Sequence, residues 1–222
     1  MVKYIELKKV NTKNLKNINL EIEKGYLVNI IGDNTSGKTS LLSLISLTDK
    51  NIDGNFSIDN VDIIKLNKLK LKKYKNNNIS YLFEDFDLLN NLSLFDNTML
   101  LNKDEEKANT LLKKLGLLNK KDYTVYELSE SEKLKLKFAI IMLKNANIYI
   151  IDNILEKLDK KNKITILKII IDYVKKEKKT IIISNNTDIM HEISNMNIYL
   201  KNSKITNIKI NKKTKLIGDI KW

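Results

Sequence analysis

The most constraining feature of this 222-residue chain is a loop at residues 32–39 that contains two glycines and a lysine. It reads Gly-Asp-Asn-Thr-Ser-Gly-Lys-Thr and fits the phosphate-loop pattern G-x-x-x-x-G-K-[ST] in full. An apolar, strand-like stretch at residues 26–31 precedes it, and apolar residues at helical spacing follow. The chain has only six glycines, and two occupy the positions that the pattern requires, which disfavours a chance match.

The chemistry of such a loop follows from its backbone. N–H groups of the loop and of the following helix converge on phosphate oxygens. Lys38 would neutralise the β- and γ-phosphates, and the Thr39 hydroxyl would ligate Mg²⁺. We therefore expect ATP and Mg²⁺ as ligands. Further phosphate contacts are expected from the other loop residues and the residue after the loop: Gly32, Asp33, Asn34, Thr35, Ser36, Gly37 and Ser40.

Strand and helix patterns alternate along most of the chain, which predicts an α/β fold with a mostly parallel sheet. The region from about residue 90 to 145 is helical throughout and has the character of an insertion. The expected strands are 4–7, 15–22, 26–31, 54–58, 79–83, 148–151, 180–184, 197–200 and 204–208. The expected helices begin at Lys38, with Leu41, Leu42, Leu44 and Ile45 buried, and continue with 94–101, 105–115, 130–143 and 160–176.

The formal charge of +13 comes from lysines that are scattered along the chain. Because no aromatic residues interleave with them as a stacking platform, we expect no nucleic-acid partner. A modest attraction to an anionic membrane surface is the alternative. No apolar run approaches the roughly 20 residues of a membrane span, the N-terminus lacks a signal-peptide pattern, and cysteine is absent. These features predict a cytoplasmic protein.

Five further segments resemble motifs of one family, the ATP-binding subunits of ABC transporters, with the nearest likeness to its lipoprotein-release and macrolide-export branch. Residues 15–25 are similar to that family's lead-in to the phosphate loop. The remaining segments are similar to its Q-loop (79–89), signature motif (127–132), Walker B strand (148–152) and D-loop (158–159).

The resemblance implies a fold, partners and a location. The fold is an α/β P-loop NTPase core with an N-terminal antiparallel β-subdomain and a helical subdomain at approximately 84–145, in one domain over residues 1–222. The partners are a transmembrane permease subunit and a second ABC ATPase subunit, identical or different, which together place the chain on the inner face of the cell membrane. Each ATP would lie between one subunit's phosphate loop and the other's signature motif.

Three implied catalytic positions depart from the family. Asp152 matches the Walker B aspartate, an implied Mg²⁺ ligand, but Asn153 replaces the glutamate that follows it. Asn186 replaces the switch histidine, and Glu84 replaces the Q-loop glutamine, an implied contact to Mg²⁺. An amide orients water but cannot accept its proton, and a positioned base contributes about 10²–10⁴-fold. Slow hydrolysis is expected, and whether the chain hydrolyses ATP at all stays open.

The signature motif is altered as well. Glu130 and Ser131 replace its two glycines. Ser129 either contacts the γ-phosphate on a partner subunit or caps the next helix together with Glu132 in a capping box, and the sequence favours neither role.

Several other side chains also have two interpretations. Glu84 is either a ligand of Mg²⁺-bound water or an exposed loop carboxylate. His191, the only histidine, lies five residues after Asn186 and is expected on a helix surface. Four apolar residues either dock a membrane subunit or belong to the core: Phe86, Leu88, Leu89 and Phe95.

The leading function is to couple ATP binding to transport by a separate membrane subunit. A nucleotide-sensing regulatory module without catalysis is one alternative, and a soluble ABC ATPase is another.

Overall fold

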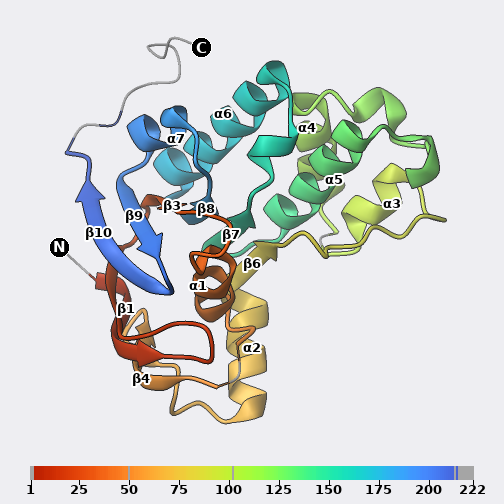
Figure 1. Ribbon diagram of the computed structural model, residues 1–222. Coiled ribbons are helices and arrows are strands. Elements are labelled where there is room, and N and C mark those ends of the chain that lie inside the picture. The colour runs from red at the N-terminus through yellow and green to blue at the C-terminus, as the bar shows by residue number, and fades with distance from the viewer. Residues whose placement is uncertain (1–2, 50, 102, 213, 215–222) are drawn as a thin grey trace.

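The computed structural model describes residues 3–49, 51–101, 103–212 and 214. Within them, a six-stranded and a four-stranded sheet lie on either side of one short helix, and the remaining helices gather mostly on the far side of the larger sheet (Figure 1). None of the described helices has the length and apolar character needed to cross a membrane.

The larger sheet has the strand order β10-β9-β3-β8-β7-β6. Its strands run parallel except at the β9–β10 pair, which is antiparallel. Every residue of β7 and β8 is buried, as expected for isoleucine-rich strands of a parallel sheet covered on both faces. The strands are β3 (Leu27–Ile31), β6 (Ile79–Leu82), β7 (Ile148–Asp152), β8 (Thr180–Ser184), β9 (Met196–Lys201) and β10 (Lys204–Ile210).

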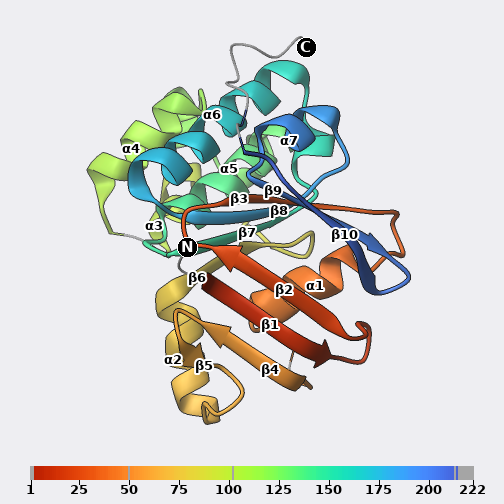
Figure 2. The same ribbon diagram turned by 90° about the vertical axis from the view of Figure 1, so that its left-hand side faces the viewer.

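The smaller sheet is antiparallel and has the order β2-β1-β4-β5 (Figure 2). Buried and exposed residues alternate along β2, which is the pattern of a strand with one face on a core. Its strands are β1 (Lys3–Asn11), β2 (Ile18–Glu23), β4 (Asp53–Ile58) and β5 (Val61–Asp62).

Helices cover the larger sheet on both faces. Helix α1 lies between the two sheets, whereas α5, α6 and α7 lie on the opposite face (Figure 1). The α-helices are α1 (Lys38–Ile45), α2 (Lys68–Asn78), α3 (Leu94–Met99), α4 (Glu105–Lys114), α5 (Glu130–Leu143), α6 (Lys160–Glu177) and α7 (Asp188–Ile193). Short 3₁₀ turns are η1 (Leu118–Lys120), η2 (Val125–Glu127) and η3 (Leu155–Lys157).

Two hydrophobic clusters meet at the larger sheet, and successive residues of β7 belong to them in turn. Ile148 and Ile150 pack with α1 and the antiparallel sheet. Tyr149 and Ile151 pack with α5, α6 and the other helices of the opposite face. Because side chains alternate across a strand, one apolar strand supplies both clusters. The sheet is thereby fixed between two packed layers.

The predicted α/β fold, with a phosphate-loop core, an antiparallel β-subdomain and a helical insertion, is confirmed. The buried face of α1 is also as predicted. The expected strand at residues 15–22 is wrong at its start, since β2 begins at Ile18 and Asn17 has a φ of 50°. Helix α2 was not expected. The predicted extent of one domain over residues 1–222 stays a prediction, and residues 1–2, 50, 102, 213 and 215–222 lie outside the description.

Candidate nucleotide-binding site

The start of helix α1 is open to an anion. Its N-cap is Gly37, which has no side chain to accept a hydrogen bond, and the first turn contains no acidic residue. The first N–H groups of a helix have no partner within the helix, and the helix dipole makes this end positive. Residues 32–37 lead directly into this end, where backbone N–H groups are available to phosphate oxygens.

Both glycines of the loop are required by its geometry. A Cβ atom on Gly32 would lie 2.5 Å from the carbonyl oxygen of Leu200 and would also collide with the Ser36 side chain. Gly37 has a φ of 102°, a conformation that residues with a side chain rarely adopt. The two positions that define the sequence pattern therefore have separate structural causes, a close approach at one and backbone conformation at the other.

The Lys38 ammonium lies beneath the loop. Its Nζ atom donates to the carbonyl oxygens of Gly32, at 2.5 Å, and Asp33, at 2.8 Å. The hydroxyl of Ser36 is buried in the same loop and has no hydrogen-bond partner among the described residues. A cation and an unsatisfied hydroxyl in one small loop suit an anionic, oxygen-rich ligand, because buried polar groups are normally satisfied.

The Asp152 carboxylate joins the loop to the end of β7. Its Oδ2 atom accepts a hydrogen bond of 2.7 Å from the Thr39 hydroxyl, and its Oδ1 atom accepts one from the Ser184 hydroxyl. Ser184 is the register partner of Asp152 in the β7–β8 pair. The carboxyl ends of parallel strands thus bring together residues from three distant parts of the sequence.

Asn153 adopts a left-handed conformation with a φ of 49°. Its backbone N–H donates to Ser184 Oγ at 3.1 Å, so one hydroxyl contacts both Asp152 and the residue after it. When the Asn153 amide is assigned the orientation that satisfies its hydrogen bonds, its nitrogen lies 3.0 Å from both carboxylate oxygens of Glu156 and donates to them.

Asn186 also lies at the phosphate loop. Its Oδ1 atom accepts a hydrogen bond of 3.2 Å from the backbone N–H of Gly32. The expected switch position is therefore next to the first residue of the loop, although 154 positions separate the two residues.

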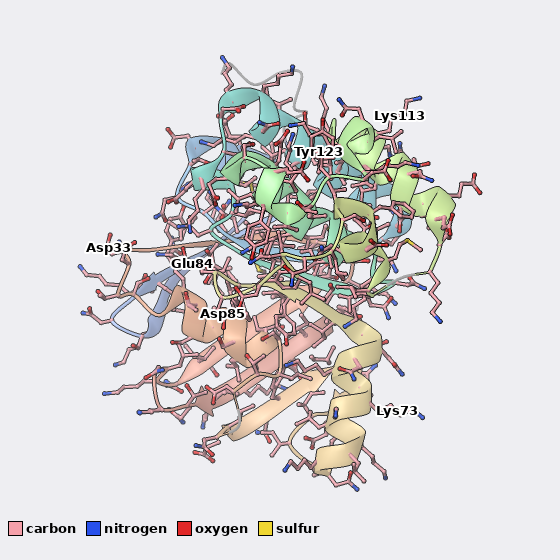
Figure 3. All side chains as sticks on the ribbon, turned by 90° about the vertical axis from the view of Figure 1, so that its right-hand side faces the viewer. Asp33, Lys73, Glu84, Asp85, Lys113 and Tyr123 are labelled. Carbon is pink, nitrogen blue, oxygen red and sulfur yellow. The ribbon has the colours of Figure 1, made fainter. Side chains whose placement is uncertain are left out.

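Glu84 is an exposed carboxylate held in an ion pair. Its Oε1 atom lies 2.6 Å from Lys157 Nζ, and 65% of its side chain is exposed. The hydrogen bond from Lys157 and the charge of that lysine lower the pKa of Glu84. Figure 3 shows Glu84 on the same side of the molecule as Asp33 of the phosphate loop.

A cavity of 270 Å³ joins the Q-loop, the start of α5 and the end of β7. Glu84, Glu130 and Lys137 line it, together with Asp152 and Asn153. The structure thus gathers three of the predicted site residues around one space.

Ser129 is the N-cap of α5. Its hydroxyl accepts the N–H of Glu132 at 3.3 Å, and Glu132 in turn accepts the N–H of Ser129 at 2.9 Å. The capping role is therefore present, and a contact with a partner's phosphate stays a prediction. Glu130 is 87% exposed at its side chain and pairs with Lys133 at 2.8 Å.

The other ambiguous side chains are also placed. Phe86, Leu88 and Phe95 pack against the core, whereas Leu89 is 50% exposed. His191 is a partly exposed residue of α7, with its ring against that of Tyr199.

Sequence reasoning missed Ser184, Glu156 and Lys157. The signal for Ser184 was a single hydroxyl at the end of the run Ile181-Ile182-Ile183. No local signal marked the other two, because their partners, Asn153 and Glu84, are found only once the turn after β7 is built.

Comparison with known proteins agrees with this geometry. The family model described as ABC transporter matches residues 15–156. The macrolide export ATP-binding/permease protein MacB of Campylobacter jejuni is 32% identical over 164 residues, which are 70% of this chain and 26% of that protein. The methionine import ATP-binding protein MetN of Vibrio vulnificus is 30% identical over 188 residues, 81% of this chain and 54% of that protein.

The fold has solved counterparts. The dimeric structure of MJ0796, a bacterial ABC transporter cassette, superposes with a TM-score of 0.83 at 25% identity and covers 93% of this chain and 98% of that one. This chain spans only about a quarter of MacB and about half of MetN. From the family match and the phosphate-loop geometry together, we conclude that this chain belongs to the ABC transporter family, as an ATP-binding cassette.

Proposed function

We propose that this chain is the ATP-binding subunit of an ABC transporter and couples ATP binding to transport by a separate transmembrane permease subunit. The observation that carries the proposal is the 2.7 Å hydrogen bond between Thr39 and Asp152, made beside the uncapped start of α1. The names of MacB and MetN, an export and an import protein, support a transport role and leave the substrate open.

The triphosphate would be bound mainly by backbone N–H groups of the loop and by the Lys38 ammonium, which would exchange two carbonyl partners for phosphate oxygens. Gly32 and Gly37 let the backbone take this shape. The other residues assigned to nucleotide contacts are Asp33, Asn34, Thr35, Ser36, Thr39, Ser40 and Asp152, with Ser129 acting on the partner subunit's nucleotide.

Thr39 and Asp152 fit an Mg²⁺ ion. Both offer oxygen atoms, the donors that this ion prefers, and they already lie at hydrogen-bond distance from each other. The described residues contain no cluster of three or more acidic or histidine side chains that could hold a metal, which suits an ion held largely by phosphate and water. Glu84 would contact a water bound to this ion, and its Oε1 atom is paired with Lys157 in this structure.

Hydrolysis by this site would be slow. Asn153 and Asn186 offer amides where a proton acceptor and a titratable group would accelerate the reaction. When Mg²⁺ is bound, it neutralises charge on the phosphates. The amide of Asn153 orients water, and the amide of Asn186 holds the first N–H of the loop.

A second ABC ATPase subunit, identical or different, would bring its signature motif to this phosphate loop, and the permease would hold the pair at the inner face of the membrane. The dimeric state in the name of the MJ0796 structure supports this arrangement.

Calorimetry tests the nucleotide-binding part. Mg-ATP added to the purified chain should release heat with saturation below millimolar concentration, and Lys38→Ala should abolish it. Lys72→Ala, in helix α2, is the control and should bind as the wild type does. A folded sample without heat of association at millimolar Mg-ATP would refute the proposal.

A nucleotide-sensing regulatory module is the second candidate, favoured by Asn153 in place of a carboxylate. Copurification with an integral membrane protein whose transport depends on ATP supports the transporter subunit. A partner whose activity responds to bound ATP without turnover supports the sensor.

A further inference from the structure

The turn after β7 is held rigidly on both sides of its exposed tip. Asn153 is fixed by its N–H bond to Ser184, and Ile154, Leu155 and Leu158 are buried at 2–4% exposure. Glu156 lies between these buried residues and is exposed. Its position relative to Asn153 is therefore set by the fold.

The orientation of the Asn153 amide is assigned from the groups that surround it. Its nitrogen lies 3.0 Å from each carboxylate oxygen of Glu156, and its oxygen then faces hydrogen-bond donors on the other side. An amide has a donor end and an acceptor end, so a carboxylate beside it selects one of the two orientations. By accepting this hydrogen bond, the Glu156 carboxylate polarises the amide, and the amide oxygen becomes a better acceptor.

We propose that Glu156 is a positioning residue for Asn153, and that position 153 works in this chain only in combination with position 156. This inference rests on the proposed function, because Asn153 lines the cavity beside Asp152 where a nucleotide-bound water would be oriented. By binding the amide nitrogen, Glu156 leaves the Asn153 oxygen as the acceptor for orienting this water.

Restoring a glutamate at position 153 would place two carboxylates next to each other across the rigid turn. Two neighbouring carboxylates repel each other, so the glutamate side chain at position 153 would turn away from the site. Asn153→Glu alone is therefore expected to give no gain in hydrolysis. Faster hydrolysis should appear only when a second substitution also removes the charge of Glu156.

The first test needs no nucleotide. The side-chain NH₂ signals of Asn153, assigned by their loss in Asn153→Asp, are followed by ¹⁵N NMR. Glu156→Ala should shift these signals and speed their hydrogen exchange, while Glu156→Gln, which keeps an acceptor, should restore them in part. Glu177→Ala, which removes an exposed glutamate at the end of α6, should leave them unchanged. Unchanged Asn153 signals in Glu156→Ala would overturn the proposal.

The second test measures single-turnover hydrolysis and ATP affinity on the same samples, with the natural partner subunits present. Glu156→Ala should slow hydrolysis by about threefold or more while the Kd for ATP changes less than about twofold. Asn153→Glu/Glu156→Ala should exceed Asn153→Glu by about tenfold or more, since a base contributes 10²–10⁴-fold once positioned.

Two outcomes of the second test contradict the proposal. One is a gain in Asn153→Glu alone that equals that of the double variant, and the other is no gain in the double variant. Asn153→Glu/Glu156→Gln repeats the comparison with a side chain of nearly the same shape, so a folding defect of one variant does not decide the result. Failure of every variant to bind ATP would instead refute the proposed function.

Discussion

The Thr39 hydroxyl donates a hydrogen bond of 2.7 Å to the Asp152 carboxylate across 113 positions of sequence. The bond ties the first turn of α1 to the end of β7, the two elements between which a nucleotide-bound metal would lie. The first turn of α1 and the buried end of β7 are thereby held as one unit.

The first prediction concerns this bond. Thr39→Val keeps the shape of the side chain and removes the hydroxyl, so it should weaken Mg-ATP binding by about 10-fold, or about 1.4 kcal/mol, because Mg²⁺ loses one oxygen ligand. Binding of ATP without Mg²⁺ should change much less. Calorimetry with and without EDTA measures both. Thr165→Val, at a partly exposed position of α6, is the control. Equal weakening with and without Mg²⁺ would argue against Thr39 as a metal ligand.

The second prediction concerns Ser184, whose hydroxyl contacts both Asp152 and the N–H of Asn153. Ser184→Ala should lower the free energy of unfolding by about 2–3 kcal/mol, because a buried carboxylate loses one donor. Ser80→Ala is a matched comparison, since that hydroxyl is equally buried but donates to the neutral carbonyl of Ile141 at 2.8 Å. It should cost only about 1 kcal/mol. Urea denaturation of both variants measures the difference, and equal costs would contradict the argument.

Local patterns of apolar residues in the sequence were sufficient to predict the helices and strands that bury an apolar face. Strand β8 and helix α5 have the bounds that their apolar residues predicted, and Lys38 begins α1 as expected. Helix α2 was not predicted, because none of its residues is fully buried and no apolar periodicity marks it. It is fixed instead by its Asn67 cap and by partial packing of Leu71 and Tyr74.

The candidate site was predictable only where it depends on strand ends. Asp152 and the phosphate loop had to meet, because parallel strands present their carboxyl ends at one edge. Glu84 contacts Lys157, and Asn153 contacts Glu156. Both contacts depend on the left-handed conformation of Asn153 and on the 3₁₀ turn η3. Such a turn sets side-chain direction residue by residue, and no repeating pattern in the sequence encodes it.

The third prediction concerns the ion pair of Glu84 and Lys157. Lys157→Met should raise the pKa of Glu84 toward its ordinary value of 4.5, because the lysine is the cause of its lowering. A depressed carboxyl pKa stabilises the fold above the unfolded-state value and loses that effect as the pH falls through the folded value. Since both side chains are about half exposed or more, the stability change should stay below about 1 kcal/mol.

A ¹³C NMR titration of the glutamate carboxyl groups checks this third prediction. Glu127 is the internal control, because its lowered pKa comes from Thr124, first from the backbone N–H and then from the hydroxyl. Its titration should be unchanged in Lys157→Met. A Glu84 titration that also stays unchanged would mean that the pair does not form in solution.

The fourth prediction concerns the acid stability of the α5 N-terminus. Burial raises the pKa of Glu132, but the hydrogen bonds from the Lys120 side chain and from the N–H and hydroxyl of Ser129 outweigh it and lower the pKa from 4.5 to about 2. The carboxylate therefore stabilises the folded chain fully above about pH 4.5. This contribution is lost as the pH falls from there through about 2.

Glu132→Gln keeps an acceptor for the capping box but removes the charge. At pH 7 the variant should be less stable than the wild type by about 2 kcal/mol, below the roughly 3 kcal/mol of the full pKa shift because solvent reaches part of the pair. The difference should shrink steadily below pH 4.5 and nearly vanish at pH 2. Urea denaturation at stepped pH values measures it. Glu130→Gln removes a neighbouring carboxylate whose side chain is 87% exposed and should change stability little at any pH. A Glu132→Gln effect that is the same at pH 2 and pH 7 would show that the carboxylate acts as a hydrogen-bonding cap alone, without its charge.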